Sequence, residues 1–220
     1  MVSIKKRRFK VFPHLLVLIA IIVTLGAGGF IAFSNMQQAD QPAAVPAPAK
    51  AHVDSTKKTP EQKLSYDVPG NRPKNLIIES LDITANILPM GILADGALDA
   101  PKSAWDVGWY NQSALPGSGQ DALLIDGHVN DALNTPGVFY NIHTLAPDDT
   151  MQIERGDGTI YTYKVTQVEQ KPIEQVDMAK MLRSVNPEVE GLNLITCGGE
   201  YDHERQTYQD RILVYAVRVS

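Results

Sequence analysis

The chain is poor in cysteine: Cys197 is the only one among 220 residues, so no disulfide can form within the chain. An exported protein with one thiol must either bury it or use it in chemistry. The chain also lacks acidic residues before Asp40, and it lacks charge of either sign from Leu15 to Phe33. This nearly all-apolar run matches the roughly 20 residues that a helix needs to cross a bilayer.

Basic residues precede the apolar run, at Lys5, Lys6, Arg7, Arg8 and Lys10. Such a flank stays in the cytoplasm, so we expect residues 1–14 to be a cytoplasmic tail and residues 15–34 a single-pass signal anchor in the cell membrane. The rest of the chain would then lie outside the cell. A cleaved signal peptide is the alternative, but its apolar region usually spans only about 7 to 15 residues. The small residues that cleavage would need, 43–49, also begin too far beyond the run.

Residues 35–70 lack the apolar side chains that a core needs and contain five prolines. We expect them to form a flexible tether between the membrane and a folded domain at residues 71–220. Without the basic tail, 15 Lys and Arg stand against 25 Asp and Glu, a balance of about −10. This charge argues against a nucleic-acid partner, because phosphate binding requires a basic face.

Strand patterns dominate the folded part, and helical periodicity is scarce. Leu81 to Ile87 alternate between apolar and polar residues, and Ala122 to Ile125 form a continuous apolar run typical of a central strand. Arg155 to Gly158 predict a hairpin turn, and Asp177 is placed to cap a short helix. The sequence therefore predicts a mainly β domain, either a closed barrel or a sandwich, with short helices.

Three predicted strands carry reactive side chains. His128 follows the run that ends at Ile125, Cys197 follows the run from Leu192 to Ile195, and Arg211 opens the last strand. We expect the strand to stop at Cys197, because Gly198 and Gly199 come next. A lone cysteine is most often a buried apolar side chain, and an isolated Gly-His is most often a turn.

The chemistry of the three side chains favours a catalytic interpretation. If the histidine and cysteine strands are parallel neighbours and the last strand is antiparallel to them, all three side chains reach one end of the sheet. A cation favours the thiolate that attacks a carbonyl, and imidazole can protonate a leaving amine. Guanidinium suits a developing oxyanion. The set is complete for acyl transfer through a thioester.

These residues resemble a sortase, a family of membrane-anchored cysteine transpeptidases, over the whole domain from about Asn71. The resemblance rests on an ordered set of motifs: Val107-Gly108-Trp109-Tyr110, Pro116-Gly117, Gly127-His128-Val129, Gly137-Val138-Phe139, Thr196-Cys197 and Arg211-Ile212-Leu213-Val214. One departure is Asn193-Leu194, where the family usually has Thr-Leu. The loop Gly198 to Asp202 resembles the class F branch, in which the arginine position is less uniform, so Arg205 is an alternative to Arg211.

The resemblance implies a sortase-type closed β-barrel and a thioester mechanism. Cys197 would cleave secreted proteins within a carboxyl-terminal sorting signal of LPXTG type, and the amine of a peptidoglycan precursor or another acceptor would resolve the acyl-enzyme. His128 would act as general acid and base, and Arg211 would stabilise the oxyanion.

Two other functions stay open at this point. A pilin polymerase would use a lysine on another subunit as acceptor, although Tyr66-Asp67-Val68-Pro69 lacks the Asp-Pro-aromatic order of the lid found in such enzymes. A non-catalytic surface binding module would keep Cys197 buried. The sequence predicts no cofactor, because the spacing of Asp126, His128, Asp131 and His143 matches no compact zinc or calcium pattern.

Overall fold

The computed structural model describes residues 54–59, 62 and 66–220, which all belong to one compact unit of the chain. The expected cytoplasmic tail and membrane anchor, residues 1–34, lie outside the described residues. Within the described part, no helix has both the length and the apolar character needed to cross a bilayer.

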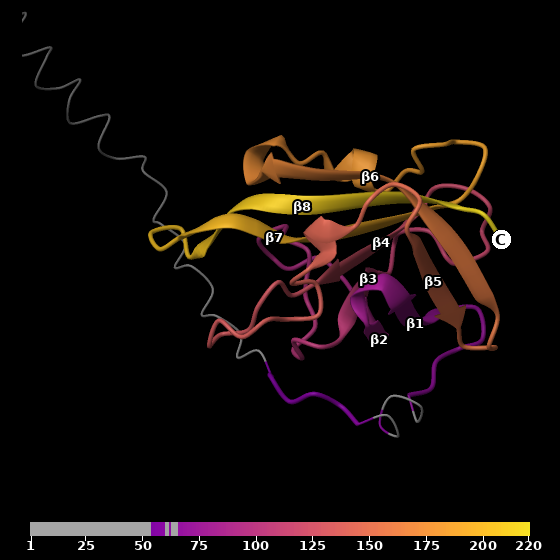
Figure 1. Ribbon diagram of the computed structural model, residues 1–220, viewed down its shortest axis with the longest axis horizontal. Coiled ribbons are helices and arrows are strands. Elements are labelled where there is room, and N and C mark those ends of the chain that lie inside the picture. Colours follow the sequence, from indigo (N-terminus) through magenta and orange to yellow (C-terminus); the bar gives the residue numbers. More distant parts are fainter. Residues whose placement is uncertain (1–53, 60–61, 63–65) are drawn as a thin grey trace, which may run out of the picture. The chain divides into compact units, whose positions relative to one another are not determined.

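Eight strands close into a barrel in the order β1-β2-β3-β4-β7-β8-β6-β5 (Figure 1). The closed β-barrel predicted from the sequence is therefore confirmed. The strands are β1 (Pro73–Ile78), β2 (Ile83–Met90), β3 (Val107–Tyr110), β4 (Ala122–Gly127), β5 (Thr150–Arg155), β6 (Ile160–Pro172), β7 (Gly191–Asp202) and β8 (Thr207–Arg218). The helical elements are short: η1 (Glu79–Leu81), η2 (Ile142–Thr144), η3 (Ile173–Gln175) and α3 (Met178–Met181).

Several local predictions are confirmed. The apolar run from Ala122 to Ile125 forms the first four residues of β4, a strand between β3 and β7 that is buried from Ala122 to Asp126. The predicted hairpin joins β5 to β6 in antiparallel pairing. Asp177 caps α3, since its Oδ1 accepts hydrogen bonds from the backbone N–H groups of Ala179 and Lys180 at 2.9 and 3.1 Å.

The predicted end of the cysteine strand is wrong. β7 does not stop at Cys197 but continues to Asp202, and β8 starts at Thr207, four residues before the predicted Arg211. The two strands stay paired beyond the glycines, with a register shift between Gly198 and Tyr201. Gly199 adopts a φ of +72°, so a bulge absorbs the glycines without ending the ladder. Figure 1 shows this hairpin projecting past the other strands.

Two apolar layers lie on either side of the sheet around β4, β7 and β8. Leu123, Ile125, Leu192 and Leu194 point into the barrel and join its main core. The alternate residues of the same strands form a smaller outer layer that packs against α3: Leu124, Ile195, Leu213 and Tyr215, together with Met181. This period of two places the side chain of Cys197 on the outer face, in line with Ile195.

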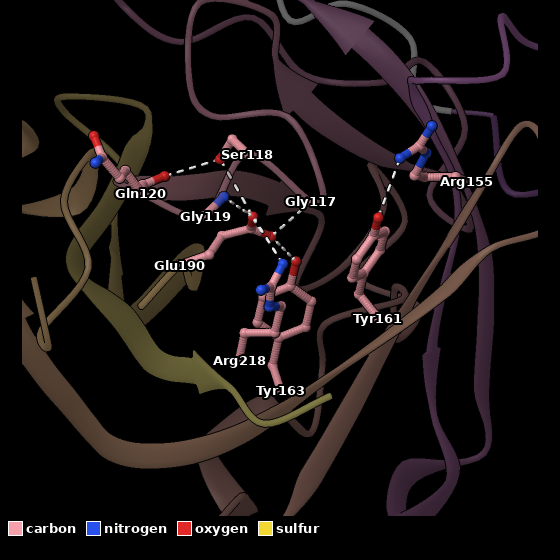
Figure 2. Close-up of polar contacts among 9 residues, drawn as sticks. All are labelled: Gly117, Ser118, Gly119, Gln120, Arg155, Tyr161, Tyr163, Glu190 and Arg218. Atoms are coloured by element: carbon pink, nitrogen blue, oxygen red, sulfur yellow. Dashed lines mark hydrogen bonds and ion pairs between the residues drawn. The ribbon is translucent and has the colours of Figure 1, made fainter. Parts of the chain in front are cut away.

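A buried carboxylate fixes the end of β7 that is remote from Cys197 (Figure 2). Glu190 has no exposed surface and accepts hydrogen bonds from the N–H groups of Gly117 and Gly119 at 3.1 and 2.9 Å. The hydroxyls of Ser118 and Tyr163 also donate to it, and Arg218 lies 3.7 Å away. Glu190 thereby joins the Pro116–Gly119 loop to β6 and β8.

Residues 54–59, expected to be part of the flexible tether, contact the barrel domain. The N–H of Asp54 donates to the carbonyl of Lys102 at 2.6 Å, and the N–H of Ala104 donates to the carbonyl of Asp54 at 2.8 Å. The Ser55 hydroxyl donates to Asp131, and Lys58 pairs with Asp106 at 2.6 Å. The segment therefore lies along the loop before β3 and reaches the loop after β4.

Candidate active site

Cys197 lies in the middle of β7, half-buried and with a free thiol. Its Cα partner on the antiparallel neighbour β8 is Arg211. Side chains directly opposite each other on paired strands leave the same face of the sheet. The structure therefore brings the cysteine and the arginine together on the outer face, as the antiparallel arrangement expected from the sequence requires.

His128 follows the last residue of β4, the parallel neighbour of β7 on its other side. The register pairs Ile125 with Leu194 and Asp126 with Ile195, so two further residues along both strands bring His128 level with Cys197. The Thr196 hydroxyl donates to the carbonyl of Gly127 at 2.7 Å and holds this edge of the two strands together. The expected parallel pairing of the histidine and cysteine strands is confirmed.

A backbone carbonyl fixes the tautomer of His128. Its Nε2 lies 2.7 Å from the carbonyl oxygen of Pro101. A carbonyl oxygen only accepts, so Nε2 must carry the proton in this hydrogen bond, and Nδ1 is the basic nitrogen of the neutral ring. The next residue, Lys102, accepts a hydrogen bond from the N–H of Asp54, so the loop before β3 is held directly beside the contact with His128.

Three influences act on the pKa of the Cys197 thiol, and one of them opposes the other two. Burial raises the pKa of the thiol, the Arg211 guanidinium lowers it, and the Asp126 carboxylate raises it. Burial acts because a thiolate loses solvation in an apolar site, and the two charges act through space. Arg211 is thus the cation that favours the nucleophilic form.

The two candidate arginines lie in different surroundings. Arg211 donates to the carbonyl groups of Tyr208 and Asp210 at 3.1 and 2.8 Å and keeps its place beside β7. Arg205 lies in the turn of the hairpin, where its side chain is 67% exposed and pairs with Glu174 at 2.9 Å. Of the two, only Arg211 shifts the pKa of Cys197.

Sequence patterns gave no sign of two groups that border the site. From the sequence, Asp126 is only an unlikely metal ligand, yet its carboxylate raises the pKa of Cys197. Pro101, which holds His128, lies in a loop without a recognisable motif. His143 is exposed on η2, and the described residues contain no cluster of three metal-binding side chains.

The family model of the sortase domain matches residues 76–219. The chain therefore belongs to the sortase family and is a cysteine transpeptidase, so the non-catalytic alternative is wrong. No curated protein has a sequence that matches this chain.

Solved sortases share the fold at low sequence identity. Sortase A from Corynebacterium diphtheriae is 24% identical with a TM-score of 0.52, over 70% of this chain and 63% of that one. A sortase from Actinomyces oris is 22% identical with a TM-score of 0.51, over 70% and 83%. The pilus-related sortase C of Group B Streptococcus is 16% identical with a TM-score of 0.52, over 70% of each chain.

Proposed function

We propose that Cys197 is the nucleophile of this transpeptidase, that His128 is its general acid and base, and that Arg211 stabilises the oxyanion. The observation that carries the proposal is the register of three strands. Arg211 pairs directly with Cys197, and the parallel pairing of β4 with β7 brings His128 level with the same residue.

In the first half of the reaction, the Cys197 thiolate attacks the carbonyl carbon of the scissile peptide bond. The carbonyl oxygen gains negative charge and accepts hydrogen bonds from Arg211. When the carbon–nitrogen bond breaks, protonated His128 gives its Nδ1 proton to the leaving amine. The products of this half are a thioester on Cys197, a neutral imidazole and a free amine-ended peptide.

In the second half, the neutral amine of an acceptor attacks the thioester carbonyl, and His128 takes up the proton that this amine loses. The carbon–sulfur bond then breaks and returns the thiolate of Cys197. One amide bond has been exchanged for another, so no cofactor or oxidant is required.

The donor that we propose is a secreted protein with an LPXTG-type sorting signal. The sortase-like motifs of the sequence and the match to the sortase domain support this choice of donor. The acceptor that we propose is an amine of a cell-wall precursor, and the enzyme would be anchored in the cell membrane by residues 15–34. The glycines and acidic residues that follow Cys197 in β7, from Gly198 to Asp202, support a class F-like assignment.

The proposal is tested with the full chain in detergent micelles, an LPXTG-type peptide and a small primary amine. Mass spectrometry should detect the transfer product with the wild type and none with Cys197→Ala. His128→Ala should abolish transfer, whereas His143→Ala, an exposed histidine on η2, should leave it unchanged. Equal product from the wild type and Cys197→Ala would refute the mechanism.

The acceptor is identified by competition in the same assay. Supplying a cell-wall precursor amine together with a protein lysine shows which of the two forms the product. Preference for the lysine would favour a pilin polymerase over a cell-wall transpeptidase, although both use the same catalytic residues.

A further inference from the structure

Asp126 stands out because it is an acidic residue within the buried strand β4. Its Cα partners are Gly108 on β3 and Ile195 on β7. The period of two places its side chain with Leu124 on the outer face of the sheet, the face that also carries Ile195 and Cys197. A carboxyl group thus lies one strand away from the nucleophile.

The glycine opposite Asp126 provides the space for its carboxyl group. A Cβ atom at position 108 would lie only 2.1 Å from Asp126 Oδ1 and 2.7 Å from Cγ of Met90. The carboxyl therefore lies directly over the backbone of Gly108, beside an apolar side chain. A larger residue at position 108 would displace it.

The carboxyl of Asp126 is buried with one of its oxygens unpaired. The residue is 8% exposed, and Oδ1 has no hydrogen-bond partner among the described residues. Burial raises its pKa well above the usual range, its own backbone N–H opposes this shift, and Asp99 in the loop before β3 adds to it. A negative charge at this position is costly, because an unpaired carboxylate loses its solvation.

The sulfur of Cys197 needs a negative charge on the same face of the neighbouring strand, two residues beyond the partner of Asp126. It must ionise to act as a nucleophile, and its partial burial opposes that ionisation. The charged groups that influence it are Arg211 from β8, which favours the thiolate, and Asp126 from β4, which opposes it. Asp126 and Cys197 lie on the same face of neighbouring strands, so the charge of the carboxyl acts through space on the ionisation of the thiol.

We propose that Asp126 is a positioning residue that acts through Cys197, because a negative charge on its carboxyl opposes a negative charge on the sulfur, which lies on the same face of the neighbouring strand. The proposal rests on the assignment of Cys197 as the nucleophile. When Asp126 is ionised, thiolate formation is suppressed; when Asp126 is protonated, the sulfur ionises more readily. An ionised Asp126 thereby lowers the reactivity of the thiol of the free enzyme toward electrophiles.

The test is the rate at which iodoacetamide alkylates the full chain in detergent micelles, measured from pH 5 to 10 by intact mass. The result is unambiguous because Cys197 is the only cysteine. Asp126→Asn keeps the shape of the side chain and removes its charge, so its alkylation profile should move to lower pH, with a several-fold faster rate at neutral pH. Asp126→Ala should move it in the same direction.

Asp99→Asn is the matched control, because Asp99 acts on Asp126 and is not among the groups that shift the thiol. Its removal makes Asp126 ionise more readily, so it must not accelerate alkylation. Profiles of Asp126→Asn and Asp126→Ala that coincide with the wild type would overturn the inference, and so would an equal acid shift in Asp99→Asn.

The same proteins separate this inference from the proposed function. If the wild type transfers no peptide while Asp126→Asn still shifts the alkylation profile, the proposed function fails and the inference about ionisation stands. If the wild type transfers peptide but neither Asp126 variant shifts the profile, the inference fails and the proposed function stands. Circular dichroism melting confirms that each variant compared is folded.

Discussion

Replacing Glu190 by glutamine should strongly destabilise the domain without altering the chemistry at Cys197. The carboxylate has no exposed surface and holds four hydrogen bonds and a neighbouring cation. Glutamine has the same shape, but its NH₂ group must replace one oxygen. Either orientation points that group at a backbone N–H, of Gly117 or of Gly119, which then has no acceptor.

The magnitude follows from these contacts. Hydrogen bonds to a charged group contribute about 1.5–3 kcal/mol each, and a buried donor without a partner costs about 1–3 kcal/mol. The pairing with Arg218 is also lost, although that side chain is 32% exposed and water can solvate part of it. Removing one partner of a buried charged network typically costs about 3–5 kcal/mol, and we expect Glu190→Gln to fall in this range.

The assay is denaturant unfolding followed by tryptophan fluorescence, with peptide transfer measured on the same samples. Seven residues of extended strand, at ~3.3 Å each, separate position 190 from Cys197, so folded Glu190→Gln should retain wild-type transfer. Glu188→Gln is the control, because Glu188 is exposed and its substitution should change stability by less than ~0.5 kcal/mol. A loss under ~1 kcal/mol for Glu190→Gln, or equal losses for both variants, would refute the reasoning.

Three further predictions concern the site and its border. Arg211→Ala should reduce the transfer rate by about 10²-fold or more, as expected for the loss of an oxyanion donor. Arg205→Ala should change the rate less than about threefold. The reverse ranking in a transfer assay would assign the role to Arg205. Because Arg211 lowers the pKa of Cys197, Arg211→Ala should also move the alkylation profile of the thiol to higher pH, and an unchanged profile would contradict the electrostatic account. The Ser55 hydroxyl is the main cause of the lowered pKa of Asp131, so Ser55→Ala should raise that pKa in an NMR titration. A carboxyl whose pKa is lowered by folding stabilises the fold at pH values above its unfolded pKa of about 3.9. This contribution is lost as the pH falls through the folded pKa. Because Ser55→Ala raises the folded pKa of Asp131, acid unfolding of the variant should begin at higher pH.

The strands that carry the site were predictable because their patterns are local. A continuous apolar run predicts β4 with His128 behind it, and the run ending at Ile195 predicts the buried part of β7. The parallel pairing of these strands was an assumption that the reactive residues suggested, and the structure confirms it. These features depend on burial of neighbouring side chains, which a sequence records directly.

The features that escaped prediction depend on contacts between distant segments. Gly198 and Gly199 indicate a break, but pairing with β8 carries β7 past them through a bulge. Asp126 and Glu190 are acidic, which predicts exposure, yet each is buried by segments remote in sequence. Gly108 leaves room for the carboxyl of Asp126, and the Pro116–Gly119 loop donates hydrogen bonds to Glu190. Neither contact can be predicted from a local sequence pattern.

The contacts of residues 54–59 determine which part of the domain first bears a pulling force applied to the chain. Any tension applied from the amino-terminal side meets these contacts before it reaches the first strand of the barrel. They attach to the loop whose Pro101 carbonyl holds His128 and to Asp131, three residues beyond that histidine. A pulling force would therefore displace the imidazole of His128 before it reached the barrel strands. Stretching this segment would disturb proton transfer while the barrel itself remained intact.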